Sequence, residues 1–251
     1  MTLNLSCDGM KAVLSKWGKI RPNHDMQDGI LHLPSWAQTA LGTPIPLYRK
    51  DHTVDGHPLL FIGGVHGDEP EGVRLAEDLL SWIRGTVKLQ KPLKDWILIP
   101  DINPDGSRLQ QRMNGRGVDL NRNFPSKDWS PESKGPRYYP GSHPGSEPET
   151  QALVNLIRDE RPRVVIHFHS WKPCVVYSGD GRMWAETVAQ GTGYEVRKDI
   201  GYPTPGSLGQ YGALDLGVPV VCVEAQEGGS LDELWPRFGR GISSLLLEKR
   251  K

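Results

Sequence analysis

Residues 59–69 read LLFIGGVHGDE, an apolar run followed by two glycines and a short polar segment. The four apolar residues predict a buried β-strand, and the glycines allow the backbone to turn tightly where that strand ends. His66 and Glu69 follow, and a strand-to-helix corner can direct an imidazole and a carboxylate at one point. Nitrogen and oxygen ligands together suit Zn²⁺. Because a His-x-x-Glu pair is common by chance, its meaning depends on the rest of the chain.

The composition is that of a folded domain without a charge bias. The chain has 251 residues, and its 30 Lys and Arg balance its 30 Asp and Glu. This balance argues against nucleic acid or an anionic membrane as the main partner. The N-terminal residues contain only short apolar runs, so we expect no signal peptide, no transmembrane segment and a cytoplasmic protein. The three cysteines are widely spaced, which favours reduced thiols.

Strand and helix patterns alternate from residue 44 onward. Strands are predicted at residues 45–48, 59–62, 96–99, 164–169, 175–177 and 218–223. Helices are predicted from residue 70, after a capping box at Ser146 and Glu149, at 183–189, at 208–216 and up to 246. The alternation predicts an α/β fold, a three-layer α/β/α sandwich around a mostly parallel mixed sheet. We expect one catalytic domain over residues 1–251, with residues 1–43 as an N-terminal extension packed on it.

Two further predicted strands also end in polar residues. His169 ends the run at 164–168, and Glu224 ends the run at 220–223. Ligands of open α/β sheets bind at the carboxyl ends of strands, so these residues could converge with His66 and Glu69. Two histidines and one glutamate leave a coordination position open for water, which is typical of catalytic zinc. Glu224 would then be the unligated carboxylate that takes a proton from the attacking water.

Two alternatives stay open at these positions. His167 and His169 are two residues apart on a strand, so they share a face and either could be the ligand. We favour His169, with His167 behind it. Glu224 could instead form a salt bridge with an arginine, because an unpaired buried carboxylate is costly.

The polar segment at residues 103–145 is too long for an idle connection. Its Asn-Pro-Asp-Gly sequence at 103–106 indicates mainly a turn. Further on, Asn121 and Arg122 form a good carboxylate receptor, because a guanidinium pairs bidentately with a carboxylate. Arg112 could stabilise a developing oxyanion, and Asp119 could orient His66.

These motifs together resemble the carboxypeptidase A-like zinc metallopeptidases. The resemblance covers residues 44–246 and rests on His66-x-x-Glu69, the DLNRN run at 119–123, His169-Ser170 and Glu224, in that order. The sequences GGVHGDE at 63–69, NPDG at 103–106 and TPGSLG at 204–209 are similar to the short bacterial branch of murein peptide amidases.

The resemblance implies an enzyme with one Zn²⁺ per chain. His66, Glu69 and His169 would hold the ion, and Asp119 would support His66. Glu224 would act as general base and then as proton donor to the leaving amine.

The resemblance also implies the substrate contacts. Arg112 would polarise the scissile carbonyl, and Asn121 and Arg122 would hold the terminal carboxylate. Tyr202 is the nearest candidate for the mobile tyrosine of the family, and Leu208 would lie near the side-chain pocket.

The implied substrate is a small cell-wall peptide with free carboxylates, cut at the γ-D-glutamyl-meso-diaminopimelate amide. Arginines of the central loop could serve its carboxylates, namely Arg108, Arg112, Arg116, Arg122 and Arg137. Two other functions compete with this one. An N-acyl amino acid deacylase of the aspartoacylase or succinylglutamate desuccinylase type shares His-x-x-Glu and a similar Asp-Leu-Asn-Arg run, and a catalytically silent peptide-binding protein would keep only the pocket.

Overall fold

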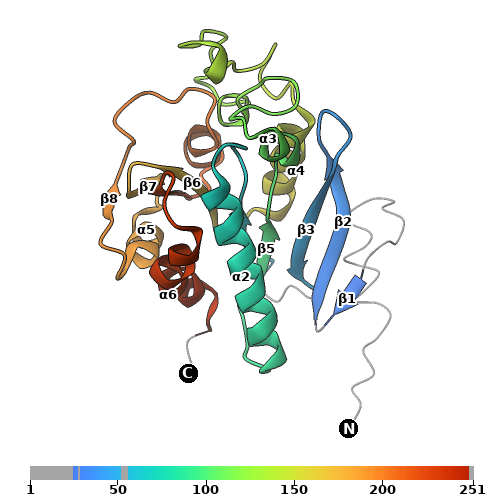
Figure 1. Cartoon of the computed structure of the whole chain (residues 1–251), viewed down its shortest axis with the longest axis vertical. Helices are drawn as coiled ribbons and strands as arrows, with labels where there is room; N and C mark the ends of the chain where they lie inside the picture. The colour runs from blue at the N-terminus through green and yellow to red at the C-terminus, as the bar shows by residue number, and fades with distance from the viewer. Residues whose placement is uncertain (1–24, 28, 52–55, 249–251) are drawn as a thin grey trace.

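A mixed sheet of nine strands organises the chain (Figure 1). This computed structural model describes residues 25–27, 29–51 and 56–248. The strands lie in the order β1-β2-β3-β5-β4-β6-β9-β7-β8. Their bounds are β1 (Asp25–Gln27), β2 (Ile30–Gln38), β3 (Pro44–Lys50), β4 (Leu59–Ile62), β5 (Trp96–Ile99), β6 (Val164–Trp171), β7 (Cys174–Ser178), β8 (Glu195–Arg197) and β9 (Val220–Gln226).

The centre of the sheet is parallel, and its outer strands are mainly antiparallel. β5, β4, β6 and β9 pair in parallel register. β1, β2 and β3 continue the sheet from β5 in antiparallel register, while β7 pairs antiparallel with β9 and parallel with β8. The part of the expected N-terminal extension that the structure describes therefore contributes strands to the sheet, and residues 1–24 lie outside the described residues.

Helices cover both faces of the sheet and confirm the predicted three layers. The α-helices are α2 (Pro70–Lys88), α3 (Pro104–Leu109), α4 (Pro148–Glu160), α5 (Arg182–Ala189) and α6 (Leu234–Leu246). Short 3₁₀ turns are η1 (Leu120–Arg122), η2 (Pro136–Tyr138) and η4 (Leu231–Glu233), and η3 (Gln210–Asp215) is a π-helix. Core contacts place α2, α5 and α6 on one face, and α4 and η3 on the other. Within the described residues no helix is long and apolar enough to cross a membrane.

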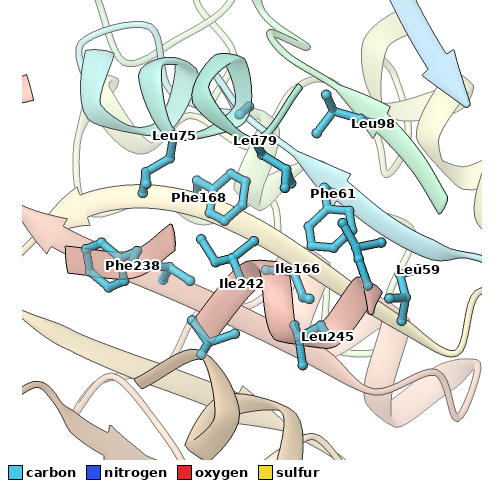
Figure 2. Close-up of a cluster of buried hydrophobic side chains, with 14 of the residues drawn as sticks. Leu59, Phe61, Leu75, Leu79, Leu98, Ile166, Phe168, Phe238, Ile242 and Leu245 are labelled. Atoms are coloured by element: carbon cyan, nitrogen blue, oxygen red, sulfur yellow. The ribbon is translucent and has the colours of Figure 1, made fainter. Parts of the chain in front are cut away.

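Alternating side chains of the central strands pack into two separate hydrophobic cores, one on each face of the sheet. Figure 2 shows Phe61, Ile166 and Phe168 packed among side chains of α2 (Leu75, Leu79) and of α6 (Ile242, Leu245). The intervening residues of the same strands point to the α4 face, where other apolar side chains bury them. This period of two leaves His167 and His169 on the α4 side of β6.

The start of α2 lies very close to β6. Pro70 occupies the first turn of the helix, and Glu69 is its N-cap. A Cβ added at Gly72 would come within 2.4 Å of the carbonyl oxygen of Phe168, so only glycine permits this approach. The close packing brings Glu69 beside His169, the next residue of β6.

The polar segment after β5 is more ordered than a turn. Pro104–Leu109 forms α3, and the Asn103 side chain caps it by accepting from the Gly106 backbone N–H. The Asn103 amide also donates to the carbonyls of Val65 and Met113. It thereby ties the loop after β4 to the loop that carries Arg112.

The capping box predicted at Ser146 is wrong. Pro148 starts α4, and Glu147 is the N-cap without a side-chain capping bond. Glu149 is instead buried, where it accepts from the Ala40 backbone N–H at 3.0 Å and from the Asn114 amide at 3.3 Å. Its carboxylate thus joins α4 to two loops rather than closing the helix end.

Candidate active site

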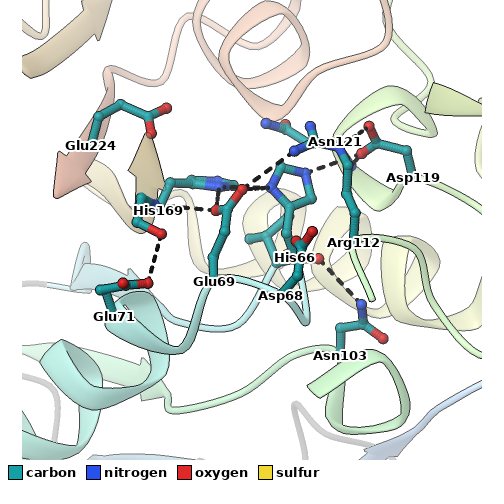
Figure 3. Close-up of polar contacts among 12 residues, drawn as sticks. His66, Asp68, Glu69, Glu71, Asn103, Arg112, Asp119, Asn121, His169 and Glu224 are labelled. Carbon is teal, nitrogen blue, oxygen red and sulfur yellow. Dashed lines mark hydrogen bonds and ion pairs between the residues drawn. The ribbon is translucent and has the colours of Figure 1, made fainter. Parts of the chain in front are cut away.

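His66, Glu69 and His169 meet at the carboxyl end of the central strands. Figure 3 shows the three side chains pointing toward one another, with Asp119 beyond His66 and Glu224 beyond His169. His66 Nδ1 lies 2.8 Å from Glu69 Oε1, and His169 Nδ1 lies 2.7 Å from Glu69 Oε2. All three residues are buried.

This donor set fits a divalent cation. The Nδ1 atoms of His66 and His169 are only 3.0 Å apart, and both also face the carboxylate of Glu69. One ligand atom from each residue lies within 4.8 Å of the others. Two imidazole nitrogens and one carboxylate oxygen are zinc ligands, and three of them leave a position open.

Electrostatics at these residues favours an ionised carboxylate. Burial acts to raise the pKa of Glu69, but the charges and hydrogen bonds of His66 and His169 outweigh it and hold that pKa well below its ordinary value. Burial and Arg112 act to lower the pKa of His66, and the carboxylates of Glu69 and Asp119 outweigh them and raise it.

Asp119 supports His66, and Arg112 supports Asp119. Asp119 Oδ1 lies 3.1 Å from His66 Nε2, and its Oδ2 accepts from Arg112 Nε at 2.9 Å. Arg112 also reaches Glu69 Oε1 with Nη1 at 3.3 Å, and its guanidinium lies over the Tyr138 ring. With Nε2 bonded to Asp119, the Nδ1 atom of His66 is the one directed at the cation position.

His167 contacts the ligand His169 but does not converge with His66, Glu69 and His169 on the cation position. Its Nδ1 lies 2.8 Å from Nε2 of His169, on the side away from Glu69. Burial, and then the neighbouring His169, lower the pKa of His167 well below its ordinary value, so the ring is neutral. A second group of metal-type ligands, His167, His169 and Cys222, overlaps the first through His169.

Glu224 lies directly beside His169, because the two residues are paired in the register of β6 and β9. It is buried, and burial raises the pKa of its carboxyl. The thiol of Cys222 donates to Glu224 Oε1 at 3.3 Å. No arginine forms an ion pair with Glu224 within the described residues, so the predicted alternative of a structural salt bridge is not found there.

Arg122 and Asn121 follow Asp119 in η1. Arg122 is buried, and its Nη1 donates to the carbonyl of Asn121. Across the described ranges no carboxylate lies within 4.0 Å of its guanidinium in an ion pair. Asn121 Oδ1 accepts from the backbone N–H of Leu208 at 3.0 Å.

Leu208 lies next to the cavity but does not line it. Its side chain is fully buried among the apolar residues of the α4 face, while Ser207 and Gly209 line the neighbouring cavity. The hydrogen bond from its backbone to Asn121 fixes this orientation. Leu208 therefore supports the Asn121 side chain rather than contacting a substrate side chain.

Tyr202 stands between two cavities beside the site. One is lined by Asn121, Glu224 and Tyr202, and the other by Arg122, Trp171 and Tyr202. The Tyr202 ring packs edge-on against Trp171, with ring centres 5.9 Å apart. The aromatic side chain is 39% exposed, as expected of a group at a cavity mouth.

Sequence reasoning missed several residues that support this site. Glu71 accepts from the Ser170 hydroxyl at 2.7 Å and from the Gly228 backbone N–H at 2.8 Å, which joins α2 to the ends of β6 and β9. Tyr138 packs under Arg112. Glu71 immediately follows the His-x-x-Glu corner and Pro70, a position that could have signalled a supporting role.

Comparison with known proteins identifies the family. The sequence profile of the zinc carboxypeptidases matches residues 26–213. The chain belongs to the zinc carboxypeptidase family. Membership establishes it as a hydrolytic enzyme, and the family name implies zinc.

The similar relatives include bacterial amidases. Murein peptide amidase A of Escherichia coli K12 is 34% identical over 222 residues, which cover 84% of this chain and 88% of that protein. The Vibrio campbellii murein peptide amidase A is 28% identical and covers 76% of this chain and 77% of its own length.

Solved structures agree with the fold. The murein-tripeptide amidase MpaA of Escherichia coli O157 aligns with a TM-score of 0.70 and 27% identity, over 100% of both chains. Thrombin activatable fibrinolysis inhibitor aligns with a TM-score of 0.73 over 87% of this chain and 68% of its own, at 18% identity. The second likeness shows the fold alone.

Proposed function

We propose that this zinc carboxypeptidase cleaves an amide bond in small cell-wall peptides, with γ-D-glutamyl-meso-diaminopimelate as its target. The observation that carries the proposal is the pairing of Glu224 with His169, which sets a buried base beside the three ligand-type side chains. Similarity to a murein peptide amidase and to a murein-tripeptide amidase supports the substrate class.

His66, Glu69 and His169 would hold Zn²⁺. When bound, the ion would polarise the scissile carbonyl and lower the pKa of a water molecule toward ~7. Glu224 would accept the proton of the attacking water and then deliver it to the leaving nitrogen. A carboxyl whose pKa is raised by burial suits both steps, because it binds the proton more readily than an exposed carboxylate.

Arg112 would stabilise the oxyanion that develops on the carbonyl. Its Nε and Nη1 atoms are already bonded to Asp119 and Glu69, so the guanidinium is held in place before substrate binds. A donor fixed in advance stabilises developing charge without reorganisation.

Arg122 and Asn121 would hold the terminal carboxylate of the substrate. The Arg122 guanidinium is buried and has no acidic partner among the described residues, so it is complementary to a carboxylate, because pairing recovers the cost of burial. Tyr202, at the mouth of both cavities, would close over the bound peptide.

The test is hydrolysis by zinc-loaded protein of L-alanyl-γ-D-glutamyl-meso-diaminopimelate, with the released amine identified by mass spectrometry. N-acetyl-aspartate and succinyl-glutamate are assayed in parallel. We expect release of diaminopimelate and no deacylation. Preferred cleavage of an acylated amino acid would replace the proposal with a deacylase, and stoichiometric zinc without any hydrolysis would indicate a binding protein.

The carboxylate receptor has its own test. Arg122→Met should weaken hydrolysis of a free-acid peptide far more than hydrolysis of the same peptide with its terminal carboxyl amidated. Arg182, an exposed arginine at the start of α5, supplies the matched control as Arg182→Met. Equal losses on both peptides in Arg122→Met would show that this residue does not bind the carboxylate.

A further inference from the structure

A cavity of about 360 Å³ opens beside Glu224, along β7 and β9. Asn121 and Tyr202 line it, and so do the charged residues Lys198 and Asp199. If Asn121 and Arg122 hold the terminal carboxylate, as the proposed function requires, the side chain of the released residue enters this cavity. The chemistry of its walls should therefore determine which residue the enzyme releases.

His167 lies against this cavity and is only 3% exposed. Its Nδ1 lies 2.8 Å from His169 Nε2, and the two rings are nearly perpendicular. In the described part of the chain Nε2 of His167 has no hydrogen-bond partner. This atom is not among the fully enclosed, unpaired side-chain atoms of the described residues, so it faces the cavity, where a group that enters can pair with it.

The geometry of the ligand set determines whether Nε2 of His167 carries a proton. His169 directs Nδ1 at Glu69 Oε2 and at His66 Nδ1, so Nδ1 is the atom that would ligate the cation. A ligating ring nitrogen carries no proton, and the proton of His169 then resides on Nε2 and is donated to His167 Nδ1. Because His167 Nδ1 accepts this hydrogen bond, the ring carries its own proton on Nε2 and acts as a donor toward an acceptor in the cavity.

Lys198 and Asp199 add opposite charges to the same cavity. Neither makes an ion pair within 4.0 Å among the described residues, and Asp199 Oδ1 accepts only from the Gly201 backbone N–H. A side chain that ends in a carboxylate alone would face the negative charges of Asp199 and Glu224. One that ends in an ammonium alone would face the like charge of Lys198, which is exposed, and would offer no acceptor to the His167 N–H.

We propose that this cavity selects a side chain that ends as an amino acid does, with a carboxylate and an ammonium group on one carbon. His167 Nε2–H and Lys198 bind the carboxylate, and Asp199 binds the ammonium. A diamino diacid such as diaminopimelate satisfies all three groups, whereas lysine lacks the carboxylate. This inference rests on the proposed function and names the residues that set its specificity.

Three γ-D-glutamyl tripeptides test it, differing only at the third residue: meso-diaminopimelate, its side-chain amide, and L-lysine. We expect kcat/KM to be about tenfold higher for the diacid, the size of effect for losing a hydrogen bond to a charged group. Lys198→Met should reduce this preference toward one, and Lys172→Met, an exposed lysine beside Trp171, should leave the preference intact.

Two variants of His167 separate the roles of its two ring nitrogens. Asparagine places an acceptor near the Nδ1 position, so His167→Asn should keep zinc affinity and raise KM for the diacid peptide only. Glutamine places a donor near the Nε2 position, so His167→Gln should keep the substrate preference and weaken zinc binding by roughly 10-fold or more, as loss of a ligand's support does. Zinc affinity is measured by competition with a chelator.

Binding of free meso-diaminopimelate and free lysine to the zinc-loaded protein, measured by calorimetry, decides the matter independently of turnover. Tighter binding of the diacid that Lys198→Met abolishes supports the proposal even if no peptide is cleaved, an outcome that would refute the proposed function alone. Equal binding of both amino acids, or equal cleavage of all three peptides, would overturn the proposal while leaving the amidase activity standing.

Discussion

The two carboxylates of the candidate active site, Glu69 and Glu224, have very different surroundings. Glu69 is held ionised between two histidines, while Glu224, on β9 at the far side of β6, is buried beside a thiol. The two groups therefore have pKa values displaced in opposite directions. Such a separation is what allows one carboxylate to remain a ligand while the other exchanges a proton.

Replacing Glu224 should separate catalysis from metal binding. In Glu224→Gln we expect kcat to fall roughly 10²- to 10⁴-fold, the range for loss of a general base. Zinc content should not change, because Glu224 is not among the converging ligands. Glu227→Gln, an exposed glutamate just beyond the same strand, is the control. Near-normal turnover of the Glu224→Gln protein, measured with the murein tripeptide, would exclude its role as base.

Asp101 offers a residue-level prediction about stability. Burial raises its pKa to about 6, although Ser107 and the Asn103 backbone N–H act to lower it. A raised folded-state pKa means that Asp101 contributes most stability below its unfolded pKa, and that this contribution is lost as pH rises through about 6.

Asp101→Asn mimics the protonated form at every pH and keeps an acceptor for the Asn103 N–H. The variant should be more stable than the wild type at pH 7.5, by up to ~3 kcal/mol for a shift of about two pKa units. The two proteins should converge near pH 4, as measured by urea unfolding. A difference that stays constant between pH 4 and 7.5 would contradict the assignment.

At the scale of elements, the contact between α2 and β6 determines how close Glu69 comes to His169. Gly72 is the residue that permits it, since an added Cβ would meet the Phe168 carbonyl oxygen at 2.4 Å. Backbone atoms of a central strand cannot move aside easily. A larger residue at this position must therefore shift the helix and the ligand that precedes it.

Gly72→Ala should lower both stability and zinc affinity. Overpacking of this kind typically costs ~1–3 kcal/mol. Gly85→Ala in the same helix meets no atom within 4 Å and should instead stabilise the protein by ~0.5–1 kcal/mol, because alanine is the better helix former. Thermal unfolding and chelator competition on both variants check the pair. Unchanged zinc affinity in Gly72→Ala would show that this contact does not position Glu69.

The elements that could be predicted from the sequence are those with strong apolar runs. β4 and β5 have the predicted bounds, and β6 and β9 differ from prediction by a few residues at their ends. β2 was not predicted, because it contains Pro34 and changes register between Leu33 and Ala37, and proline argues against a strand. α3 has only six residues, and its cap at Asn103 has the composition of a turn.

The site residues also divide into those that the sequence could predict and those that it could not. His66, Glu69, His169 and Glu224 could be proposed because each follows an apolar run whose end lies at one edge of a parallel sheet. The hydrogen bonds of His167 and the position of Lys198 depend on contacts between β6, β7 and a distant loop, which no local pattern encodes. Leu208 lies next to the cavity, as predicted, but the sequence does not show that its side chain faces the core.

On the scale of the whole molecule, the ligand set joins the loop after β4 to the end of β6, segments about a hundred residues apart in the chain. An unfolded chain does not hold this set together, so zinc should bind the folded state and stabilise it. At a zinc concentration 1,000-fold above the dissociation constant, the gain is ~4 kcal/mol.

For a chain of this length such a gain corresponds to a rise of roughly 10 °C in Tm, at ~2–4 °C per kcal/mol. We therefore expect chelator-treated protein to unfold at a lower temperature than the zinc-loaded protein, by calorimetry at equal protein concentration. His66→Ala removes one ligand and should abolish the zinc-dependent shift, whereas His57→Ala, outside the ligand set, should retain it. A shift that persists in His66→Ala would place the stabilising ion elsewhere, with the overlapping group of His167, His169 and Cys222 as the first position to examine.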